Sequence, residues 1–282
     1  MSSATATERV FNFSAGPATL PLKVLQEAQQ NLLCLPGAGA SILEISHRSA
    51  PFEAIIQSAE QDMRSLLGIP EDYAVLFLQG GATTQFSMIP MNFLDASGSA
   101  DYVLQGAWSK KAISEAKKCG GVKVVWDGSA EKFSRVPNPG EFQPSAEARY
   151  LHITSNETIE GIEFHHDPDC GAVPLVCDAS SDFMHRPMDI SKYALIYAGA
   201  QKNVGPAGAT VVIIRKDLLE RQVGKNLPTM LDYKKTVAGA SLHNPPPVFT
   251  IYILHLVMRW LRDDMGGLAK MLVHNQKKAA LL

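Results

Sequence analysis

The most informative segment of the chain reads Gly199-Ala200-Gln201-Lys202-Asn203-Val204-Gly205-Pro206-Ala207-Gly208. Two apolar runs enclose it, Ala194–Tyr197 and Thr210–Ile214, and each predicts a strand. Most lysines are solvated surface charges, but Lys202 lies among glycines and alanines, where an ammonium would be partly desolvated. A lysine amine that loses its proton can form a Schiff base, and the small neighbours leave space for a bulky adduct.

The pattern of short apolar strands and helices continues on both sides of this segment. Further strands are predicted at Ala74–Leu78, Asp101–Leu104, Val122–Trp126, Tyr150–Ile153 and Val173–Cys177. Helices are predicted at Pro21–Cys34, Thr83–Leu94, Ser109–Cys119, Val248–Leu261 and Leu268–Leu282, with one more that Ser49 caps and that runs to Leu66. Strands that alternate with helices indicate an α/β fold, with a mainly parallel sheet covered by helices on both faces.

The composition is that of an ordinary globular protein. The chain has 282 residues, of which 46% are hydrophobic and 19% are charged, and its formal net charge is -2. No bulk charge indicates a nucleic-acid or membrane partner, so we expect a small-molecule site. The four cysteines form no Cys-x-x-Cys pair, which favours a reducing compartment, and Cys177 is interpreted as a small core residue. The polar N-terminus and the short apolar stretches predict neither a secretory signal nor a membrane span, so we expect a cytoplasmic protein.

In a sheet of this type, ligands bind at the carboxyl ends of the strands. The strand Ala74–Leu78 is followed by Gln79-Gly80-Gly81-Ala82-Thr83-Thr84-Gln85-Phe86, where small residues and hydroxyls open a helix. Backbone N–H groups and the helix dipole would make this loop a phosphate cradle, although an ordinary tight turn would carry the same residues. The loop matches neither the dinucleotide-binding pattern Gly-x-Gly-x-x-Gly nor the P-loop pattern, which counts against both kinds of site.

Two further strand ends carry groups that a flat, nitrogen-containing ring could use. Trp108 follows Asp101–Leu104 and could stack on a ring, or it could pack in the core. Asp178 follows Val173–Cys177 and needs a partner, either a pyridinium N–H or the backbone of a helix cap or surface turn. A phosphate cradle, a ring stacker, a carboxylate and a lysine are together what pyridoxal 5'-phosphate requires.

Several motifs of the chain resemble those of a known family. They are Asn12-Phe13-Ser14-Ala15-Gly16-Pro17-Ala18, Ser46-His47-Arg48, Gln79-Gly80-Gly81, Asn156-Glu157-Thr158, Asp178-Ala179-Ser180-Ser181 and Gly199-Ala200-Gln201-Lys202-Asn203. From about Val10 to the C-terminus, the chain resembles the phosphoserine aminotransferases, a family of class-V aminotransferases. The resemblance implies an aspartate-aminotransferase-like fold of type I, pyridoxal 5'-phosphate as the cofactor, and a homodimer.

The resemblance also implies catalytic roles for three residues. Lys202 would form the Schiff base and would move the proton between Cα and C4′. Asp178 would pair with the pyridine nitrogen, and Trp108 would stack on the ring. The implied reaction transfers an amino group between L-glutamate and 3-phosphohydroxypyruvate, which gives O-phospho-L-serine and 2-oxoglutarate for serine biosynthesis. Some members of the family also act on a phosphorylated precursor in pyridoxine biosynthesis.

Other positions match residues that bind the cofactor or the substrate in this family. Thr158 would bond the phenolic oxygen of the ring. The residues that would hold the cofactor phosphate are Ala82, Thr83 and Gln201, together with Asn244 of the other subunit. Arg48 would contact substrate anions, because a guanidinium donates in a fork, and His47 would lie beside it. Without the family pattern, Arg48 would be interpreted as a surface ion-pair residue and His47 as a structural histidine.

The sequence departs from the family pattern in two places. Family members usually have Asn-Thr-Pro-Pro where this chain has Asn244-Pro245-Pro246-Pro247, and Pro245 has neither a hydroxyl nor a backbone N–H. We therefore expect weaker binding of the cofactor phosphate. We also expect residues 10–265 to form the cofactor-binding domain and residues 266–282 to begin a connector helix, without the small C-terminal domain whose arginine and histidine bind substrate in the family.

These departures leave three interpretations open. The chain would be a phosphoserine aminotransferase, a catalytically impaired homologue that binds pyridoxal 5'-phosphate, or another fold-type-I enzyme with the same cofactor. No metal site is expected, because the ligand-type residues of His165-His166-Asp167-Pro168-Asp169-Cys170 are too close together for a tetrahedral site and indicate a loop. The chain has no Gly-x-Ser-x-Gly motif, which counts against an α/β-hydrolase.

Overall fold

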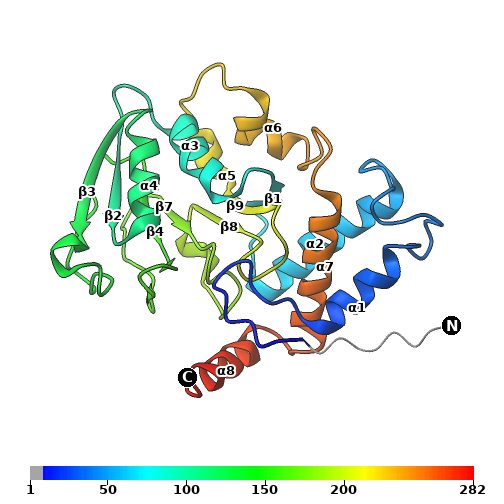
Figure 1. Cartoon of the computed structure of the whole chain (residues 1–282). Coiled ribbons are helices and arrows are strands. Elements are labelled where there is room, and N and C mark those ends of the chain that lie inside the picture. Colours follow the sequence, from blue (N-terminus) through cyan, green and yellow to red (C-terminus); the bar gives the residue numbers. More distant parts are fainter. Residues whose placement is uncertain (1–8) are drawn as a thin grey trace.

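A seven-stranded sheet forms the centre of the molecule (Figure 1). The computed structural model describes residues 9–282. From one edge of the sheet to the other, the strands are β1 (Tyr73–Leu78), β9 (Thr210–Arg215), β8 (Leu195–Gly199), β7 (Leu175–Asp178), β4 (Leu151–Thr154), β2 (Ser99–Leu104) and β3 (Gly121–Asp127). In this sheet β9 runs antiparallel to both of its neighbours, and all the other neighbouring pairs are parallel. The predicted mainly parallel α/β sheet is therefore confirmed.

Helices cover both faces of the sheet, as predicted. One face packs against α2 (Ala50–Leu67) and α7 (Val248–Asp263), with α1 (Leu22–Asn31) beside α7. The other face packs against α3 (Gly81–Phe93), α4 (Ala107–Ala116), α5 (Lys216–Glu220) and α6 (Tyr233–Ala238). Along β1, Val75 and Phe77 belong to the first core, whereas Leu76 and Leu78 belong to the second. Because all of β1 is buried, its sequence is a continuous apolar run.

Several element boundaries differ from the predicted ones by a few residues. β7 begins at Leu175 rather than Val173, because Pro174 has no N–H to donate to a neighbouring strand. The helix α3 begins at Gly81 rather than Thr83, and α8 (Leu268–Ala279) ends before Leu282. Short elements were not predicted at all. They are the helices α5 and α6, the hairpin of β5 (Asn156–Glu157) and β6 (Ile162–Glu163), and 3₁₀ turns at Gly128–Glu131, Ile190–Lys192 and Thr229–Leu231.

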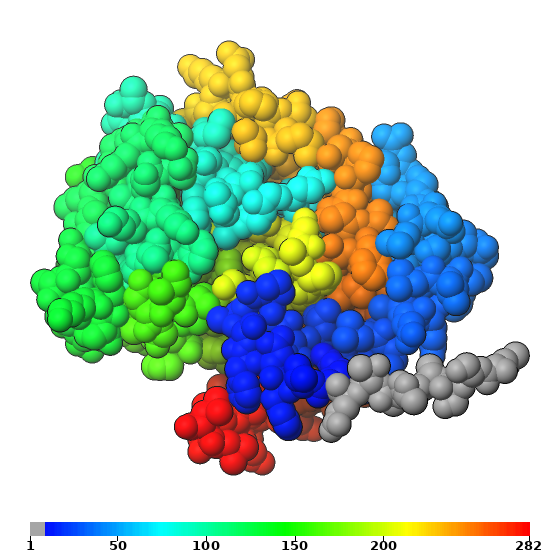
Figure 2. All heavy atoms as spheres, in the orientation of Figure 1, coloured from blue at the N-terminus to red at the C-terminus, as the bar shows by residue number. Residues whose placement is uncertain are grey.

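The two ends of the described chain attach to the loops that follow β7 and β8. The N-terminal segment, blue in Figure 2, lies on the surface and binds the turn after β8, where Ala18 N–H donates to the carbonyl oxygen of Gln201 (3.0 Å). The C-terminal α8, red in Figure 2, is joined to the loop after β7 by Asn275, whose Nδ2 donates to the carbonyl oxygen of His185 (3.0 Å). Both terminal segments therefore pack near the carboxyl ends of the central strands.

The structure bears on the predictions about membrane spans and cysteines. Within residues 9–282, no helix combines the length and the apolar character that a membrane crossing requires. The four cysteines are free thiols, and Cys177 is fully buried in the core, as predicted.

Candidate active site

A cavity of about 130 Å³ lies at the carboxyl ends of the central strands. Its wall contains the three residues that were predicted to do chemistry, Lys202, Asp178 and Trp108. The other wall residues are Gly81, Ala82, Thr83, Thr154, Asn156, Thr158, Ser180, Ser181 and Gln201. All the predicted site residues except His47, Arg48 and Asn244 therefore meet in one cavity, although they come from distant parts of the sequence.

The first turn of α3 forms one end of this cavity. Its leading N–H groups have no acceptor within the helix, and Gly80 at the N-cap position has no side chain to satisfy them. Gly80 has a φ of 92°, and a Cβ there would clash with the side chain of Thr84, so this close turn requires glycine. Open N–H groups at a helix N-terminus favour an anionic group such as a phosphate.

Lys202 lies in the turn after β8, and its side chain packs against two other parts of the chain. Its Nζ is 5.8 Å from the centroid of the Trp108 ring. A Cβ at Gly16 would lie 2.6 Å from Cδ of Lys202 and 3.1 Å from its Nζ. The N-terminal segment therefore approaches the lysine so closely that a larger residue at position 16 would displace it.

Asp178 ends β7 and is almost fully buried. It accepts a hydrogen bond of 2.9 Å from the backbone N–H of Ser180, which is one of the partners considered from the sequence. Burial raises the pKa of Asp178, whereas Ser180, Tyr197 and the positive charge of Lys202 oppose that rise. A carboxylate in this position can bind a cationic N–H that enters the cavity.

Two glutamates fix the start of the helix that carries Trp108. The fully buried Glu157 accepts hydrogen bonds from the N–H groups of Trp108 (2.9 Å) and Ser109 (2.8 Å). Glu160 accepts a third bond, from the N–H of Ala107 (2.9 Å). Burial raises the pKa of Glu157, although the N–H groups that it binds favour its charged form. The sequence analysis assigned no role to Glu157, and its only signal was that Glu157 lies in the family motif Asn156-Glu157-Thr158.

The wall of the cavity fits pyridoxal phosphate. Among the described residues, Nε1 of Trp108 and Oγ1 of Thr154 are buried without a hydrogen-bond partner. Such atoms are uncommon in folded proteins unless a ligand or a water molecule completes them. An indole, a buried carboxylate, a lysine amine and an open helix N-terminus match the ring, the ring nitrogen, the aldehyde and the phosphate of this cofactor.

The remaining predicted residues, His47, Arg48 and Asn244, lie outside this cavity. Arg48 is exposed, and its side chain makes no hydrogen bond or ion pair with any residue in 9–282. His47 is partly buried, and its Nε2 has no partner in the same part of the chain. Asn244 lies next to the phosphate-cradle loop, because its Oδ1 accepts a bond from Nε2 of Gln79 (3.4 Å). A single chain therefore does not bring these three residues to the cavity.

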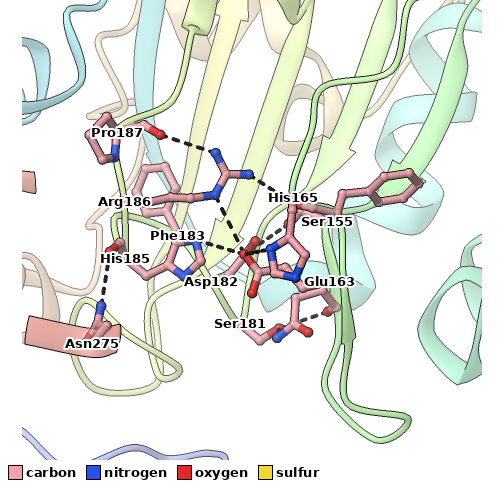
Figure 3. Close-up of polar contacts among 12 residues, drawn as sticks. Ser155, Glu163, His165, Ser181, Asp182, Phe183, His185, Arg186, Pro187 and Asn275 are labelled. Carbon is pink, nitrogen blue, oxygen red and sulfur yellow. Dashed lines mark hydrogen bonds and ion pairs between the residues drawn. The ribbon is translucent and has the colours of Figure 1, made fainter. Parts of the chain in front are cut away.

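A network of ion pairs lies next to the cavity and was not predicted (Figure 3). Oε1 of Glu163 is 3.1 Å from Nε2 of His185 and 3.7 Å from Nε of Arg186. The buried Asp182 accepts a hydrogen bond of 2.6 Å from Oγ of Ser155, and burial raises the pKa of Asp182 to about 6. Glu163, Asp182 and His185 offer ligand atoms within 4.8 Å of one another, but the guanidinium of Arg186 beside Glu163 already balances negative charge. We therefore interpret the cluster as an ion-pair network.

Comparisons with known proteins agree with the interpretation of the cavity as a pyridoxal phosphate site. The family model described as Aminotransferase class-V matches residues 10–282. A phosphoserine aminotransferase of Rhodopirellula baltica is 53% identical over 283 residues, and the match covers 100% of this chain and 75% of that protein. The phosphoserine aminotransferase of Bacillus circulans subsp. alkalophilus has a similar structure, with a TM-score of 0.94 and 49% identity over 98% of this chain and 76% of that one.

A PLP-bound phosphoserine aminotransferase from Trichomonas vaginalis is also similar, with a TM-score of 0.89 and 39% identity over 96% of this chain and 76% of that one. This chain thus spans about three quarters of the length of these relatives. The family match extends over almost all the described residues, and the solved structures share both the sheet and its helices. The chain therefore belongs to the class-V aminotransferases.

Proposed function

We propose that the chain is a phosphoserine aminotransferase, which uses pyridoxal 5'-phosphate to transfer an amino group between L-glutamate and 3-phosphohydroxypyruvate. The products are O-phospho-L-serine and 2-oxoglutarate. The observation that carries this proposal is the cavity in which Lys202, Asp178 and Trp108 surround one space beside the open N-terminus of α3. Relatives named phosphoserine aminotransferase, 53% and 50% identical to this chain, support the choice of substrates.

Lys202 has two roles in this proposal. When bound, pyridoxal 5'-phosphate supplies an aldehyde that captures amines and a ring that withdraws electrons from the substrate Cα. Lys202 would hold the cofactor through Nζ and, as a free amine, would take up the proton that leaves the substrate Cα. The ring of Trp108 and the N-terminal segment at Gly16 limit the positions that Nζ can take.

The other wall residues orient the cofactor. The Asp178 carboxylate would hold the proton on the ring nitrogen, and Trp108 would stack on the ring from a helix start that Glu157 fixes. Thr158 lines the cavity and would bond the phenolic oxygen of the ring. The N-terminal N–H groups of α3 bind the phosphate, and so do the residues Ala82, Thr83 and Gln201.

A homodimer would explain the three predicted residues outside the cavity. Arg48 is exposed, and its fork of donors suits the phosphate or the carboxylate of a substrate held by a second copy of the chain. His47 lies next to it in the sequence. Asn244 lies beside Gln79, which begins the phosphate-cradle loop. If this loop lies at a subunit boundary, Asn244 of one subunit can bind the cofactor phosphate of the other. Pro245 contributes neither a hydroxyl nor an N–H there, and we propose that this weakens phosphate binding.

The proposal includes the organisation and the location of the chain. Residues 10–265 are the cofactor-binding domain, and residues 266–282 are a connector helix that packs on the loop after β7 through Asn275. The cytoplasm is the proposed compartment, which the four free thiols support, because thiols stay reduced there.

The proposed reaction is tested with purified protein that has been loaded with pyridoxal 5'-phosphate. We expect O-phosphoserine to form from L-glutamate and 3-phosphohydroxypyruvate, with Lys202→Ala as the inactive control. Unphosphorylated 3-hydroxypyruvate should react much more slowly, because an anion-binding group such as Arg48 would then lack its partner. Binding of the cofactor without product would refute the reaction, and equal rates with both acceptors would refute the substrate assignment.

A further inference from the structure

Two buried polar residues, Tyr197 and His152, lie on the same face of the sheet as Asp178. In the strand register, Asp178 of β7 pairs with Tyr197 of β8 on one side and with Thr154 of β4 on the other. His152 is two residues before Thr154, so its side chain points to the same face. The exposed fractions of Tyr197, His152 and Asp178 are 0%, 1% and 3%, so water does not satisfy their polar atoms.

A hydrogen bond with a defined direction links two of these residues, His152 and Tyr197. Nε2 of His152 lies 2.9 Å from the hydroxyl oxygen of Tyr197, and Nδ1 of His152 is buried without a partner among the described residues. Burial lowers the pKa of His152 to about 3, so the imidazole is neutral and carries one proton. A buried donor without a partner is rarer than a buried acceptor without one, which places that proton on Nε2. His152 therefore donates to Tyr197.

The O–H of Tyr197 is then available to Asp178, with which Tyr197 pairs in the strand register. Its oxygen already accepts the proton of His152, so its O–H is free to donate elsewhere. Burial raises the pKa of Tyr197, which keeps the hydroxyl protonated at any physiological pH. The same hydroxyl lowers the pKa of Asp178, in the direction expected of a donor to a carboxylate.

We propose that His152 and Tyr197 form a buried relay that orients the Asp178 carboxylate at the wall of the cavity. This inference rests on the proposed function, in which Asp178 binds the ring nitrogen. His152 and Tyr197 touch neither the cofactor nor the substrate in this scheme, so they are positioning residues.

The surroundings of the relay hold it in one arrangement. Tyr102 stacks on His152, with ring centroids 4.9 Å apart and an angle of 23° between the rings. The hydroxyl of Tyr102 hydrogen-bonds that of Tyr150 at 2.8 Å. This second hydroxyl pair lies in the same buried layer but is not part of the link to Asp178, which makes Tyr150 a matched control position.

Other groups also act on Asp178 and must stay constant in a test. Lys202 faces it from the turn after β8, Ser180 binds it from the following loop, and Cys177 precedes it on the same strand. The relay makes a contribution separate from these groups, because Tyr197 lies beside Asp178 on the neighbouring strand β8. The variants below leave all three groups in place.

The test compares wild-type protein with Tyr197→Phe, His152→Phe and the control Tyr150→Phe. The dissociation constant of pyridoxal 5'-phosphate is measured by absorbance between about pH 4 and about pH 8, a range that begins near the ordinary pKa of a carboxyl group. Protonation of Asp178 on acidification removes the partner of the ring nitrogen, so binding weakens below its pKa. Loss of the Tyr197 hydroxyl raises that pKa, so we expect the weakening to begin about one pH unit higher and the affinity to be about tenfold lower.

His152→Phe should shift the profile in the same direction by a smaller amount, because Tyr197 keeps its O–H. It also tests the relay if Tyr197→Phe fails to fold, which circular dichroism would reveal. Tyr150→Phe should reproduce the wild-type profile. Equal profiles in the Tyr197, His152 and Tyr150 variants would overturn the relay while leaving the proposed function intact. A wild-type protein that binds no pyridoxal 5'-phosphate would overturn the proposed function and the relay with it.

Discussion

Replacement of Glu157 by alanine should loosen the start of α4 and thereby displace Trp108. The side chain accepts two hydrogen bonds, from the N–H groups of Trp108 at 2.9 Å and Ser109 at 2.8 Å, and it is fully buried. Hydrogen bonds to a charged group contribute about 1.5–3 kcal/mol each. The cost of burying the carboxylate, visible in its raised pKa, offsets part of this gain. We therefore expect the free energy of unfolding to fall by about 3 kcal/mol.

The effect on the cofactor follows from the position of Trp108. An aromatic stacking contact contributes about 0.5–1.5 kcal/mol, so its loss should weaken the binding of pyridoxal 5'-phosphate up to about tenfold. Urea unfolding of the cofactor-free protein measures the first effect, and absorbance titration measures the second. Glu160→Ala removes a single bond, to the N–H of Ala107, and should show about half of the stability loss. An unchanged dissociation constant in a destabilised Glu157→Ala protein would refute the role of Glu157 in positioning Trp108.

Three further predictions concern single positions at the same site. Gly80→Ala should lose about 1–3 kcal/mol of stability and bind the cofactor phosphate more weakly, because its φ is 92° and a Cβ would clash. Gly37→Ala, with a φ of 80° and no atom within 4 Å of its Cβ, is the matched control, and an equal loss in both would contradict the clash. Gly16→Ala should slow amino transfer about tenfold with little loss of stability, because its Cβ would lie 2.6 Å from Cδ of Lys202. A rate of amino transfer equal to that of wild type would contradict this close approach. Burial raises the pKa of Glu157, so its protonated form favours folding. The stability advantage of wild type over Glu157→Gln should therefore be largest below the ordinary glutamate pKa of 4.5 and should decline as pH rises through the raised pKa. Urea unfolding at several pH values measures this advantage, and the opposite trend would contradict the burial argument.

The strands of the sheet could be predicted because most of them are buried on both faces. Such strands are continuous apolar runs, as in β1 and β9, and short runs between loop signals are easy to recognise. The hairpin of β5 and β6 could not be predicted, since strands of two residues have no measurable periodicity. The boundary of β7 was wrong because periodicity does not show which backbone N–H groups find partners, and Pro174 has none.

The centre of the candidate site could be predicted because its residues follow strand ends. Lys202, Asp178 and Trp108 each follow an apolar run, directly or after a short loop, and parallel strands bring such positions to the same end of the sheet. The supporting residues could not be predicted in this way. Glu157 acts on a helix start 49 residues away, and the Tyr197 hydroxyl reaches across to another strand from a run that is otherwise apolar. Those contacts depend on the tertiary fold and leave no local pattern in the sequence.

The central claim is that Lys202 holds pyridoxal 5'-phosphate covalently, and its most direct test is to locate the bond. Protein loaded with the cofactor is reduced with borohydride, digested and examined by mass spectrometry. We predict a phosphopyridoxyl group on the peptide that contains Lys202, and none on any peptide of Lys202→Ala treated in the same way. A modification on a different lysine, or an unmodified Lys202 peptide in protein that has bound the cofactor, would contradict the account.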